Sequence, residues 1–242
     1  MMIISKFLKP KTYRNFFAYH FSKKYKPSYA QCGEDIIINT FLSGLGITQP
    51  TYIDIGTYHP ILGNNTYLFY KKGGHGICVE PDDAFYKVIK RIRTHDVVLN
   101  AGAGPVEKSA ADFYKMSSHN LNTFSKDEAE ETATKKHYGD QKIKGVVQIP
   151  LVTVTNLIKN YLHNQAPDIL SIDAEGLDFD IVSSIDFSIH RPKVICTETL
   201  RYNRDGKLEK EKDVEDYLAT KGYVLYADTY VNSIFVDAKV MR

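Results

Sequence analysis

Residues 51–56 read TYIDIG, a short apolar run that closes on an aspartate and a glycine. A run of this length that ends in a turn signal is typical of a buried β-strand. The preceding residues 30–45 carry an apolar stripe at helical spacing, and Gly44 and Gly46 would end that helix. A helix followed at once by a buried strand indicates a chain of the α/β type.

The alternation of helices and strands continues along the rest of the chain. Further strands are predicted over residues 76–80, 96–100, 110–116, 146–152, 168–173, 193–198, 223–227 and 233–236. Helices are predicted over residues 65–72, 82–93, 154–161, 177–185 and 213–221. Strands separated by helices pair in parallel, within a sheet that helices cover on both faces. The last two strands have no helix between them, so we expect an antiparallel hairpin at one edge of a mostly parallel, seven-stranded sheet.

The composition is that of an ordinary globular domain, with 242 residues of which 43% are hydrophobic and 25% are charged. This length allows one large domain with a well-buried core. The three cysteines are odd in number and far apart, which indicates free thiols rather than a disulfide framework or a zinc motif. No run of about 18 apolar residues occurs. We therefore expect a cytoplasmic protein without a transmembrane helix.

Charge is distributed unevenly along the chain. Residues 1–30 contain seven Lys and Arg residues and no acidic residue, which leaves 24 basic against 29 acidic residues, a formal charge of −5, in the rest. We therefore separate a basic, aromatic N-terminal arm or helix, residues 1–29, from a domain over residues 30–242. The favoured interpretation of the arm is a solvated helix packed loosely on the domain, and the alternative is weak contact with an anionic membrane surface. The acidic domain speaks against a nucleic-acid partner.

The stretch 117–145 interrupts the regular alternation. It is rich in Ser, Asn, Thr, Lys and Glu and contains only isolated large apolar residues. Such a stretch inside a compact domain is typical of a surface insertion or a lid. We expect it to shape the pocket for a substrate.

Three successive predicted strands end in polar or small residues. Asp54 and Gly56 follow the first, Glu80 the second (GICVEP) and Asn100 the third (DVVLNAGAG). Ligands of an open α/β sheet bind beyond the carboxyl ends of its strands, and an acidic residue there can accept the hydroxyl protons of a ribose. The small residues after Asn100 would let an adenine ring lie flat against the backbone. Ordinary turn chemistry explains each motif taken singly, but the three in order favour a nucleoside pocket.

The turn after the first strand, YIDIGTYHP, is neither GxGxxG nor a P-loop with its lysine. A dinucleotide requires close backbone approach to its pyrophosphate, whereas a sulfonium nucleoside has no phosphate and needs only one glycine. The turn therefore favours a sulfonium nucleoside over a dinucleotide.

A fourth predicted strand runs into ILSIDAEG, which places Asp173 and Glu175 at a strand end ahead of a helix. If the ligand is a sulfonium nucleoside that donates a methyl group, this methyl group and the substrate should meet at this position. The alternative is purely structural, because Asp173 can cap the helix and Glu175 is favourable at a helix start. Glu198, in ICTET, is a weaker candidate of the same kind.

These motifs resemble the FkbM-type family of methyltransferases that use S-adenosyl-L-methionine. The matching segments are AQCGEDIII (30–38), YIDIGTYHPILGNNTYLFYKKGGHGICVEP (52–81), VVLNAGAG (97–104), HNLNTFS (119–125), DILSIDAEGLDFDIV (168–182) and VICTETL (194–200). The resemblance implies a Rossmann-like class I methyltransferase fold and methyl transfer to oxygen, with a sugar or another hydroxylated metabolite as acceptor.

By motif position, the resemblance implies that Asp54, Gly56, Glu80 and Asn100 contact the cofactor. It also places Asn65 and Asp173 at the border of the cofactor site.

The candidates for the base that takes the proton of an acceptor hydroxyl are His59, His119, Asp173 and Glu175. A histidine titrates near neutrality, and His59 follows the first glycine turn; a surface loop histidine is the alternative. His119 lies in the predicted lid, where a structural role is favoured. We favour His59 or Asp173. Asp173 and Glu175, together with Glu198, could instead hold a divalent metal such as Mg²⁺ against substrate hydroxyls.

The sequence thus predicts an O-methyltransferase that acts on a hydroxyl of a sugar, a nucleotide sugar or a surface saccharide, a role in saccharide biosynthesis. Two alternatives remain open. One is a nicotinamide-dependent oxidoreductase on a similar sheet, which the missing GxGxxG disfavours. The other is a module without catalytic activity that binds a glycan or a partner protein.

Overall fold

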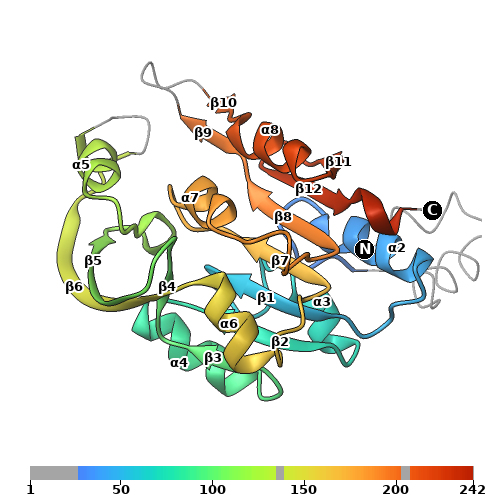
Figure 1. Ribbon diagram of the computed structural model, residues 1–242. Coiled ribbons are helices and arrows are strands. Elements are labelled where there is room, and N and C mark those ends of the chain that lie inside the picture. Colours follow the sequence, from blue (N-terminus) through green and yellow to red (C-terminus); the bar gives the residue numbers. More distant parts are fainter. Residues whose placement is uncertain (1–26, 135–138, 203–207, 242) are drawn as a thin grey trace, which may run out of the picture.

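A seven-stranded sheet forms the centre of the protein (Figure 1). The computed structural model describes residues 27–134, 139–202 and 208–241. The strands lie in the order β11-β12-β8-β7-β1-β2-β3. Their bounds are Thr51–Ile55 (β1), His75–Val79 (β2), Val97–Leu99 (β3), Ile169–Ile172 (β7), Val194–Glu198 (β8), Tyr223–Asp228 (β11) and Asn232–Asp237 (β12).

The sheet is mostly parallel, as the sequence predicts. The strands from β3 through β2, β1 and β7 to β8 pair in parallel. β12 is antiparallel to β8 on one side and to β11 on the other, so the last two strands form a hairpin at one edge. Tyr230, in the turn between them, has a left-handed φ of 76°.

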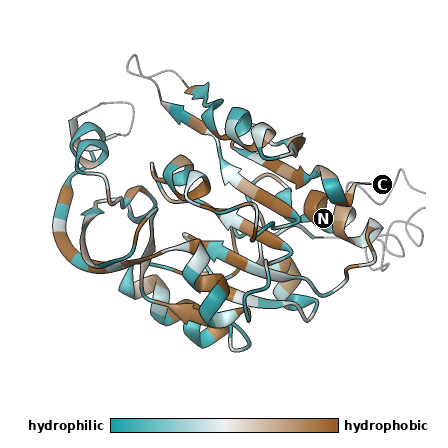
Figure 2. Cartoon of the chain, viewed as in Figure 1, coloured by the Kyte–Doolittle hydropathy of each residue, from teal (hydrophilic) through white to brown (hydrophobic). Residues whose placement is uncertain are grey.

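Helices cover both faces of this sheet. Their bounds are Glu34–Gly44 (α2), Tyr67–Lys71 (α3), Asp83–Ile92 (α4), Val154–Tyr161 (α6), Asp178–Ser183 (α7) and Asp213–Thr220 (α8). One core joins Ile53 and Ile55 of β1 to α6, α7 and α8, and a second core joins Tyr52 to α2 and α3. Because alternate side chains of a strand point to opposite faces, β1 supplies both cores. Figure 2 shows the hydrophobic residues concentrated along these central strands.

A second sheet of three strands lies beside the first. β4 (Gly102–Ala103) pairs in parallel with β6 (Ile143–Val152), and β6 pairs antiparallel with β5 (Lys108–Met116). The predicted insertion over residues 117–145 holds the short helix η2 (His119–Leu121) and α5 (Lys126–Thr134). α5 lies at the same side of the molecule as β5 and β6 (Figure 1), and η2 contacts β5. The insertion is therefore carried by a long hairpin rather than by an irregular loop.

Three local features differ from what the sequence predicts. No strand is predicted between residues 100 and 110, yet β4 lies there, because a pairing partner in β6 overrides its weak strand propensity. The hairpin of β9 (Leu200–Tyr202) and β10 (Leu208–Lys210) was not predicted. The first helix begins at Glu34 rather than at residue 30, since Gly33 has a φ of 92° that a right-handed helix cannot contain.

The predictions for the N-terminal arm concern residues 1–29, and residues 1–26 lie outside the part of the chain that the structure describes. The last residues of the arm are anchored to the domain: Ser28 Oγ donates to Asp35 Oδ1 and the Tyr29 amide donates to Asp35 Oδ2, both at 2.7 Å. Among the described residues, no helix has the length and apolar character needed to cross a membrane. A short helix, η4 (Ala238–Val240), follows β12 near the C-terminal end.

Candidate active site

A cavity of about 400 Å³ lies beyond the carboxyl ends of the central strands. Gly56, Glu80, Asp173 and Glu198, from the ends of β1, β2, β7 and β8, line one wall. The second sheet and its connections supply the facing wall, in which Gly102, Ala103, Phe113, His119, Asn122 and Phe124 take part. The volume is in the range of small-molecule sites, and the position is the one at which open α/β sheets bind ligands.

Gly56 forms the floor of the cavity at a place that admits no side chain. Its φ is 72°, and a Cβ on this residue would lie 1.8 Å from the carbonyl oxygen of Asp173. The backbones of β1 and β7 are this close because the Asp173 amide donates to the Ile55 carbonyl at 3.0 Å. A glycine is therefore required for the two strand ends to meet beneath the cavity.

Glu80 follows β2 and places a buried carboxylate in the wall of the cavity. Its Oε2 accepts from the Tyr58 amide at 2.8 Å and its Oε1 accepts from the Asp82 amide at 2.7 Å. Each oxygen accepts one hydrogen bond from a backbone amide and keeps further capacity for a ligand hydroxyl. Burial raises the pKa of Glu80 to about 7, although these two backbone amides lower it in part. The arrangement suits a carboxylate that accepts both hydroxyl protons of a ribose.

Three more carboxylates, Asp173, Glu175 and Glu198, gather at the end of the cavity near β7 and β8. Within the described residues, none of these carboxylates has a hydrogen-bond partner. Burial and the neighbouring Asp178 charge raise the pKa of Asp173 to about 7. Burial and the Asp173 charge raise the pKa of Glu198 to about 9 and hold the pKa of Glu175 well above its usual range. The raised pKa values indicate that the positive charge near these three carboxylates does not balance their negative charge.

Glu175 reaches the cavity from a strained turn. Its φ is 44°, in the left-handed region that non-glycine residues rarely adopt. Two contacts hold the turn: Thr123 Oγ1 donates to the Glu175 carbonyl at 2.9 Å, and the Ala174 amide donates to Asp178 Oδ1 at 3.2 Å. Strain of this kind persists only where the surroundings impose it, and it is concentrated at functional sites.

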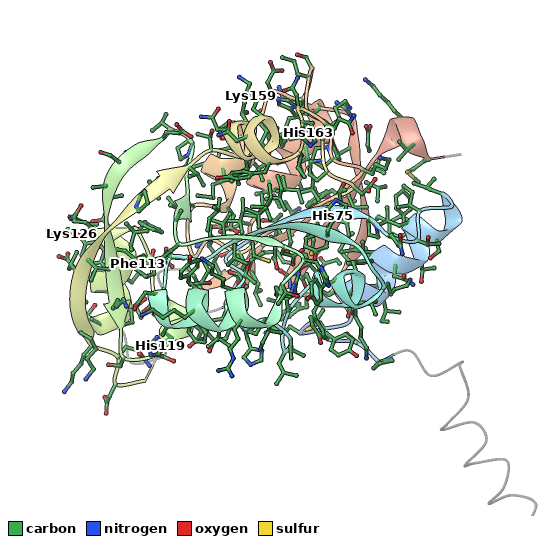
Figure 3. All side chains as sticks on the ribbon, turned by 90° about the horizontal axis from the view of Figure 1, so that it is seen from below. His75, Phe113, His119, Lys126, Lys159 and His163 are labelled. Atoms are coloured by element: carbon green, nitrogen blue, oxygen red, sulfur yellow. The ribbon has the colours of Figure 1, made fainter. Side chains whose placement is uncertain are left out.

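A polar and aromatic group closes the opposite end of the cavity. His119 Nδ1 lies 2.9 Å from Asp82 Oδ2, which also accepts from Asn122 Nδ2 at 3.0 Å. The rings of Phe113 and Phe124 lie 4.7 Å apart. Figure 3 shows Phe113 and His119 on the side of the molecule where the second sheet meets α4. Flat apolar rings beside polar groups are suited to a purine.

The structure brings six of the residues that the sequence singled out together around the cavity: Gly56, Glu80, His119, Asp173, Glu175 and Glu198. Asp54, His59, Asn65 and Asn100 are absent from its lining. Sequence reasoning missed Phe113, Phe124 and Tyr58 as lining residues. Phe124 lies in the segment HNLNTFS, which resembles the family, but the sequence assigns a role in this segment only to His119.

Asp54 and Asn100 instead hold the loops that form the cavity. Asp54 is buried, and its Oδ2 accepts from Thr66 Oγ1 at 2.7 Å and from Asn64 Nδ2 at 3.1 Å. Burial raises the pKa of Asp54. Asn100 Nδ2 donates to the carbonyls of Glu80 and Pro81, both at 3.0 Å. Asn100 thus acts on the cavity through the position of Glu80.

His59 and Asn65 also make contacts within the protein. His59 Nδ1 accepts hydrogen bonds from the amides of Ile61 and Leu62 at 3.1 and 2.9 Å. This ring nitrogen therefore stabilises the turn after His59. Asn65 Nδ2 donates to Ser171 Oγ at 3.2 Å. Among the described residues, no group of three or more His, Cys, Asp or Glu side chains is arranged to hold a metal ion.

The order of the strands, the antiparallel β12 and the site beyond their carboxyl ends define a Rossmann-like class I methyltransferase fold. A sequence profile of the family described as the methyltransferase FkbM domain matches residues 54–225. The chain belongs to this family, which confirms the resemblance seen in the sequence, and it is an S-adenosylmethionine-dependent methyltransferase. No curated protein matches the sequence significantly.

Several solved structures are similar to this chain. A putative caffeoyl-CoA O-methyltransferase from Staphylococcus aureus is 11% identical, with a TM-score of 0.45 and 96% of this chain and 94% of that chain covered. A putative RNA methyltransferase from Pyrococcus horikoshii is 12% identical, with a TM-score of 0.42 and coverages of 93% and 98%. An O-methyltransferase from Bacillus cereus in complex with SAH is 12% identical, with a TM-score of 0.40 and coverages of 96% and 93%.

The residues of the cavity fit S-adenosylmethionine. Glu80 matches a ribose, the rings of Phe113 and Phe124 match an adenine, and the cluster of Asp173, Glu175 and Glu198 matches a cationic sulfonium. Within the described residues the lining contains no Lys or Arg that could hold a pyrophosphate. When bound, S-adenosylmethionine supplies a methyl group already activated for transfer.

We expect the affinity for S-adenosylhomocysteine to fall as the pH is lowered through about 7. Glu80 must be deprotonated to accept two hydroxyl protons, and burial places its pKa at about 7. Calorimetric titrations at about pH 6 and about pH 8 measure this change. In Glu80→Gln we expect roughly tenfold weaker binding, because a charge-assisted hydrogen bond is lost, and a smaller pH dependence. If the affinity of the wild type and that of Glu80→Gln depend equally on pH, the group that titrates is not Glu80 and the prediction is wrong.

We also expect Glu198→Gln to stabilise the ligand-free protein at alkaline pH. With a pKa of about 9, Glu198 binds its proton more tightly in the folded state than in the unfolded chain, so stability falls as the pH rises from about 4.5 towards 9. Thermal unfolding is measured at about pH 5 and about pH 8. The decrease in Tm between these two pH values should be smaller in the variant than in the wild type, by roughly 2–4 °C for each kcal/mol by which the pH-dependent loss of stability is reduced. Glu130→Gln, in an exposed residue of α5, is the control. A variant whose Tm decreases as much as that of the wild type would contradict the prediction.

Proposed function

We propose that the protein transfers a methyl group from S-adenosylmethionine to a hydroxyl of a sugar, a nucleotide sugar or a surface saccharide. The observation that carries this proposal is the group of carboxylates at one end of the cavity, which accept no hydrogen bond from any residue that the structure describes. Hydroxyl groups donate hydrogen bonds to carboxylates, and a carboxylate with a pKa of about 7 can take a proton at neutral pH.

Asp173 is the residue that we assign as the general base. It follows β7 at the floor of the cavity, where its carbonyl oxygen faces Gly56 and its side chain lines the open space. The acceptor oxygen forms a bond to the methyl carbon while the bond from that carbon to sulfur breaks, and the hydroxyl proton passes to the Asp173 carboxylate. The electron pair of the broken bond stays on sulfur, so charge and atoms balance.

Orientation should contribute more than the base does. Holding two reactants in line is worth roughly 7–11 kcal/mol, whereas a general base contributes about 10²–10⁴-fold in rate. Gly56 and Glu80 support this assignment because they would fix the cofactor at two points, and Glu175 and Glu198 would hold acceptor hydroxyls beside Asp173. His59 remains a candidate base only through its second ring nitrogen, since Nδ1 accepts two backbone hydrogen bonds.

The experiment that tests the function has two parts. Calorimetry with S-adenosylhomocysteine measures cofactor binding. Incubation with methyl-labelled cofactor and a panel of saccharides, nucleotide sugars and RNA, followed by mass spectrometry, identifies the acceptor atom. Binding of the cofactor with transfer to a saccharide oxygen is the expected outcome.

Transfer to RNA alone would overturn the saccharide assignment, and so would binding of a glycan without any transfer. A change in NADH fluorescence on mixing would favour the oxidoreductase instead. The lining speaks against that outcome, because four carboxylates would face the pyrophosphate of a dinucleotide.

A further inference from the structure

We propose that the acceptor carries a protonated amine, held between Glu175 and Glu198, and that it is an amino saccharide rather than a phosphate-bearing one. The proposal rests on the proposed saccharide methylation and narrows its substrate class. It starts from the sign of charge around the cavity and from the way in which two of the carboxylates are held there.

The lining of the cavity is acidic. Glu80, Asp173, Glu175 and Glu198 all contribute to it, and no Lys or Arg does so within the described residues. The cofactor accounts for only part of this charge, since a sulfonium carries one positive charge and the amino-acid group of S-adenosylmethionine is a zwitterion. Two carboxylates near the acceptor end are therefore left for a second ligand.

The nearby cations are hydrogen-bonded to other acidic groups and not to the cluster. Arg201 donates from Nη2 to Asp178 Oδ2 at 2.9 Å and from Nε to Glu211 Oε2 at 2.7 Å, and its Nη1 lies 3.7 Å from Glu128 Oε2. Lys210, farther along the chain, lies 2.8 Å from Asp228 Oδ1. The Arg201 charge lowers the pKa values of Asp173 and Glu198 only in part, since both remain raised.

Glu175 and Glu198 are fixed in place by their backbones. The strained turn at Glu175 is held by Thr123 from the second sheet, and Gly176 follows it with a φ of 103° against the side chain of Glu128. Glu198 is the last residue of β8 and pairs with Asn232 of β12. Glu175 and Glu198 are half-buried, lie on separate elements and have no hydrogen-bond partner in the part of the chain that the structure describes, so they form a site built for a donor that supplies several hydrogen bonds.

An ammonium group meets this requirement better than a hydroxyl does. It has three donors and a full positive charge, and it offsets the burial that raises the pKa values of Glu175 and Glu198. A protonated amine has no free electron pair, so the nucleophile remains a neighbouring hydroxyl. A diphosphate in the same place would face carboxylates with no cation to pair with, which excludes a nucleotide-linked sugar from this half of the cavity.

The test compares pairs of saccharides that differ only in the amine. The methyl glycosides of glucosamine, galactosamine and mannosamine are titrated by calorimetry into protein saturated with S-adenosylhomocysteine, beside their N-acetyl counterparts and UDP-glucose. We expect at least one free amine to bind about 10- to 100-fold more tightly than its N-acetyl counterpart, the range for a desolvated, charge-assisted hydrogen bond. If no amine binds more tightly than its counterpart, or if UDP-glucose binds best, the proposal is wrong.

Substitutions of the two glutamates test whether the amine preference depends on this site or only on the overall charge of the protein. Glu175→Gln and Glu198→Gln should each remove most of the amine preference, because the affinity for the amine falls more than the affinity for the N-acetyl counterpart when the full charge is lost. Glu130→Gln, an exposed residue of α5, should change neither. An amine preference that survives in both cavity variants overturns the proposal.

The same panel distinguishes this proposal from the proposed function. Methyl transfer to a neutral or phosphorylated saccharide alone would keep the methyltransferase assignment and overturn the amine. Tight, glutamate-dependent binding of an amine without transfer to any saccharide would support the amine site and overturn the proposed reaction. Methyl transfer to an oxygen of an amino saccharide supports both the proposed function and the ammonium site. Methyl transfer to its nitrogen contradicts the proposal that the amine is bound in its protonated form.

Discussion

Replacing Asp173 with asparagine should lower kcat by about 10²–10⁴-fold while the affinity for S-adenosylhomocysteine changes by less than about threefold. Asparagine keeps the size of the side chain and removes its capacity to take a proton. The variant should also fold well, because it removes one of several mutually repelling carboxylates. Initial rates with labelled cofactor and a saccharide acceptor, together with calorimetric affinities, measure the two quantities.

The pH profile gives this prediction a second readout. Burial and the Asp178 charge raise the pKa of Asp173 to about 7, so kcat of the wild type should rise with pH through about 7 and then level off. Asp173→Asn should lose this rise. Asp180→Asn, in an exposed residue of α7, is the matched control and should retain both the rate and the profile. An Asp173→Asn enzyme of normal activity would mean that another group, such as His59, accepts the proton.

Replacing Arg93 with methionine should lower the free energy of unfolding by about 3–5 kcal/mol, the range for breaking a buried ion pair from one side. Arg93 is fully buried; its Nε donates to Asp96 Oδ2 at 2.8 Å and its Nη2 donates to Thr66 Oγ1 at 2.9 Å. Methionine has a similar length but leaves Asp96 and the nearby Asp54 without a compensating positive charge.

Urea unfolding followed by circular dichroism measures this loss. Arg91→Met, in the exposed last turn of α4, is the control and should change the free energy of unfolding by less than about 0.5 kcal/mol. A loss below about 1 kcal/mol in Arg93→Met would show that the buried carboxylates are protonated without cost in the folded protein. The affinity for S-adenosylhomocysteine should also decrease, because Arg93 Nη1 donates to the Pro60 carbonyl and holds the loop after β1.

The two predictions concern neighbouring strands, because Asp173 follows β7 and the Arg93 charge acts on Asp54 of β1. Tyr52 belongs to the core beneath α2 and α3, whereas Ile53 and Ile55 belong to the core beneath α6, α7 and α8. Asp54 therefore points to the side of Tyr52, into the buried polar cluster around Arg93, and the floor of the cavity is left to Gly56.

Sequence reasoning located the elements well where the pattern is local. The strand over residues 51–55 and the helix over residues 154–161 have the predicted bounds. β4 and the β9–β10 hairpin were missed, since two- and three-residue strands have no periodicity of their own and depend on a distant partner. In β4, Gly102 pairs with Leu151, a residue 49 positions away.

The sequence by itself determined the α/β order of the chain, its family and the strand ends around which the cavity lies. The reason is that apolar periodicity and turn residues act within a few residues of one another. Only the tertiary structure decided which polar side chains at those ends reach the cavity. Glu80 and Asp173 line it, while Asp54 and Asn100 support its walls. That division depends on the direction of each side chain and on partners such as Arg93 and Thr66, which lie far away in the sequence and become neighbours only when the sheet has formed.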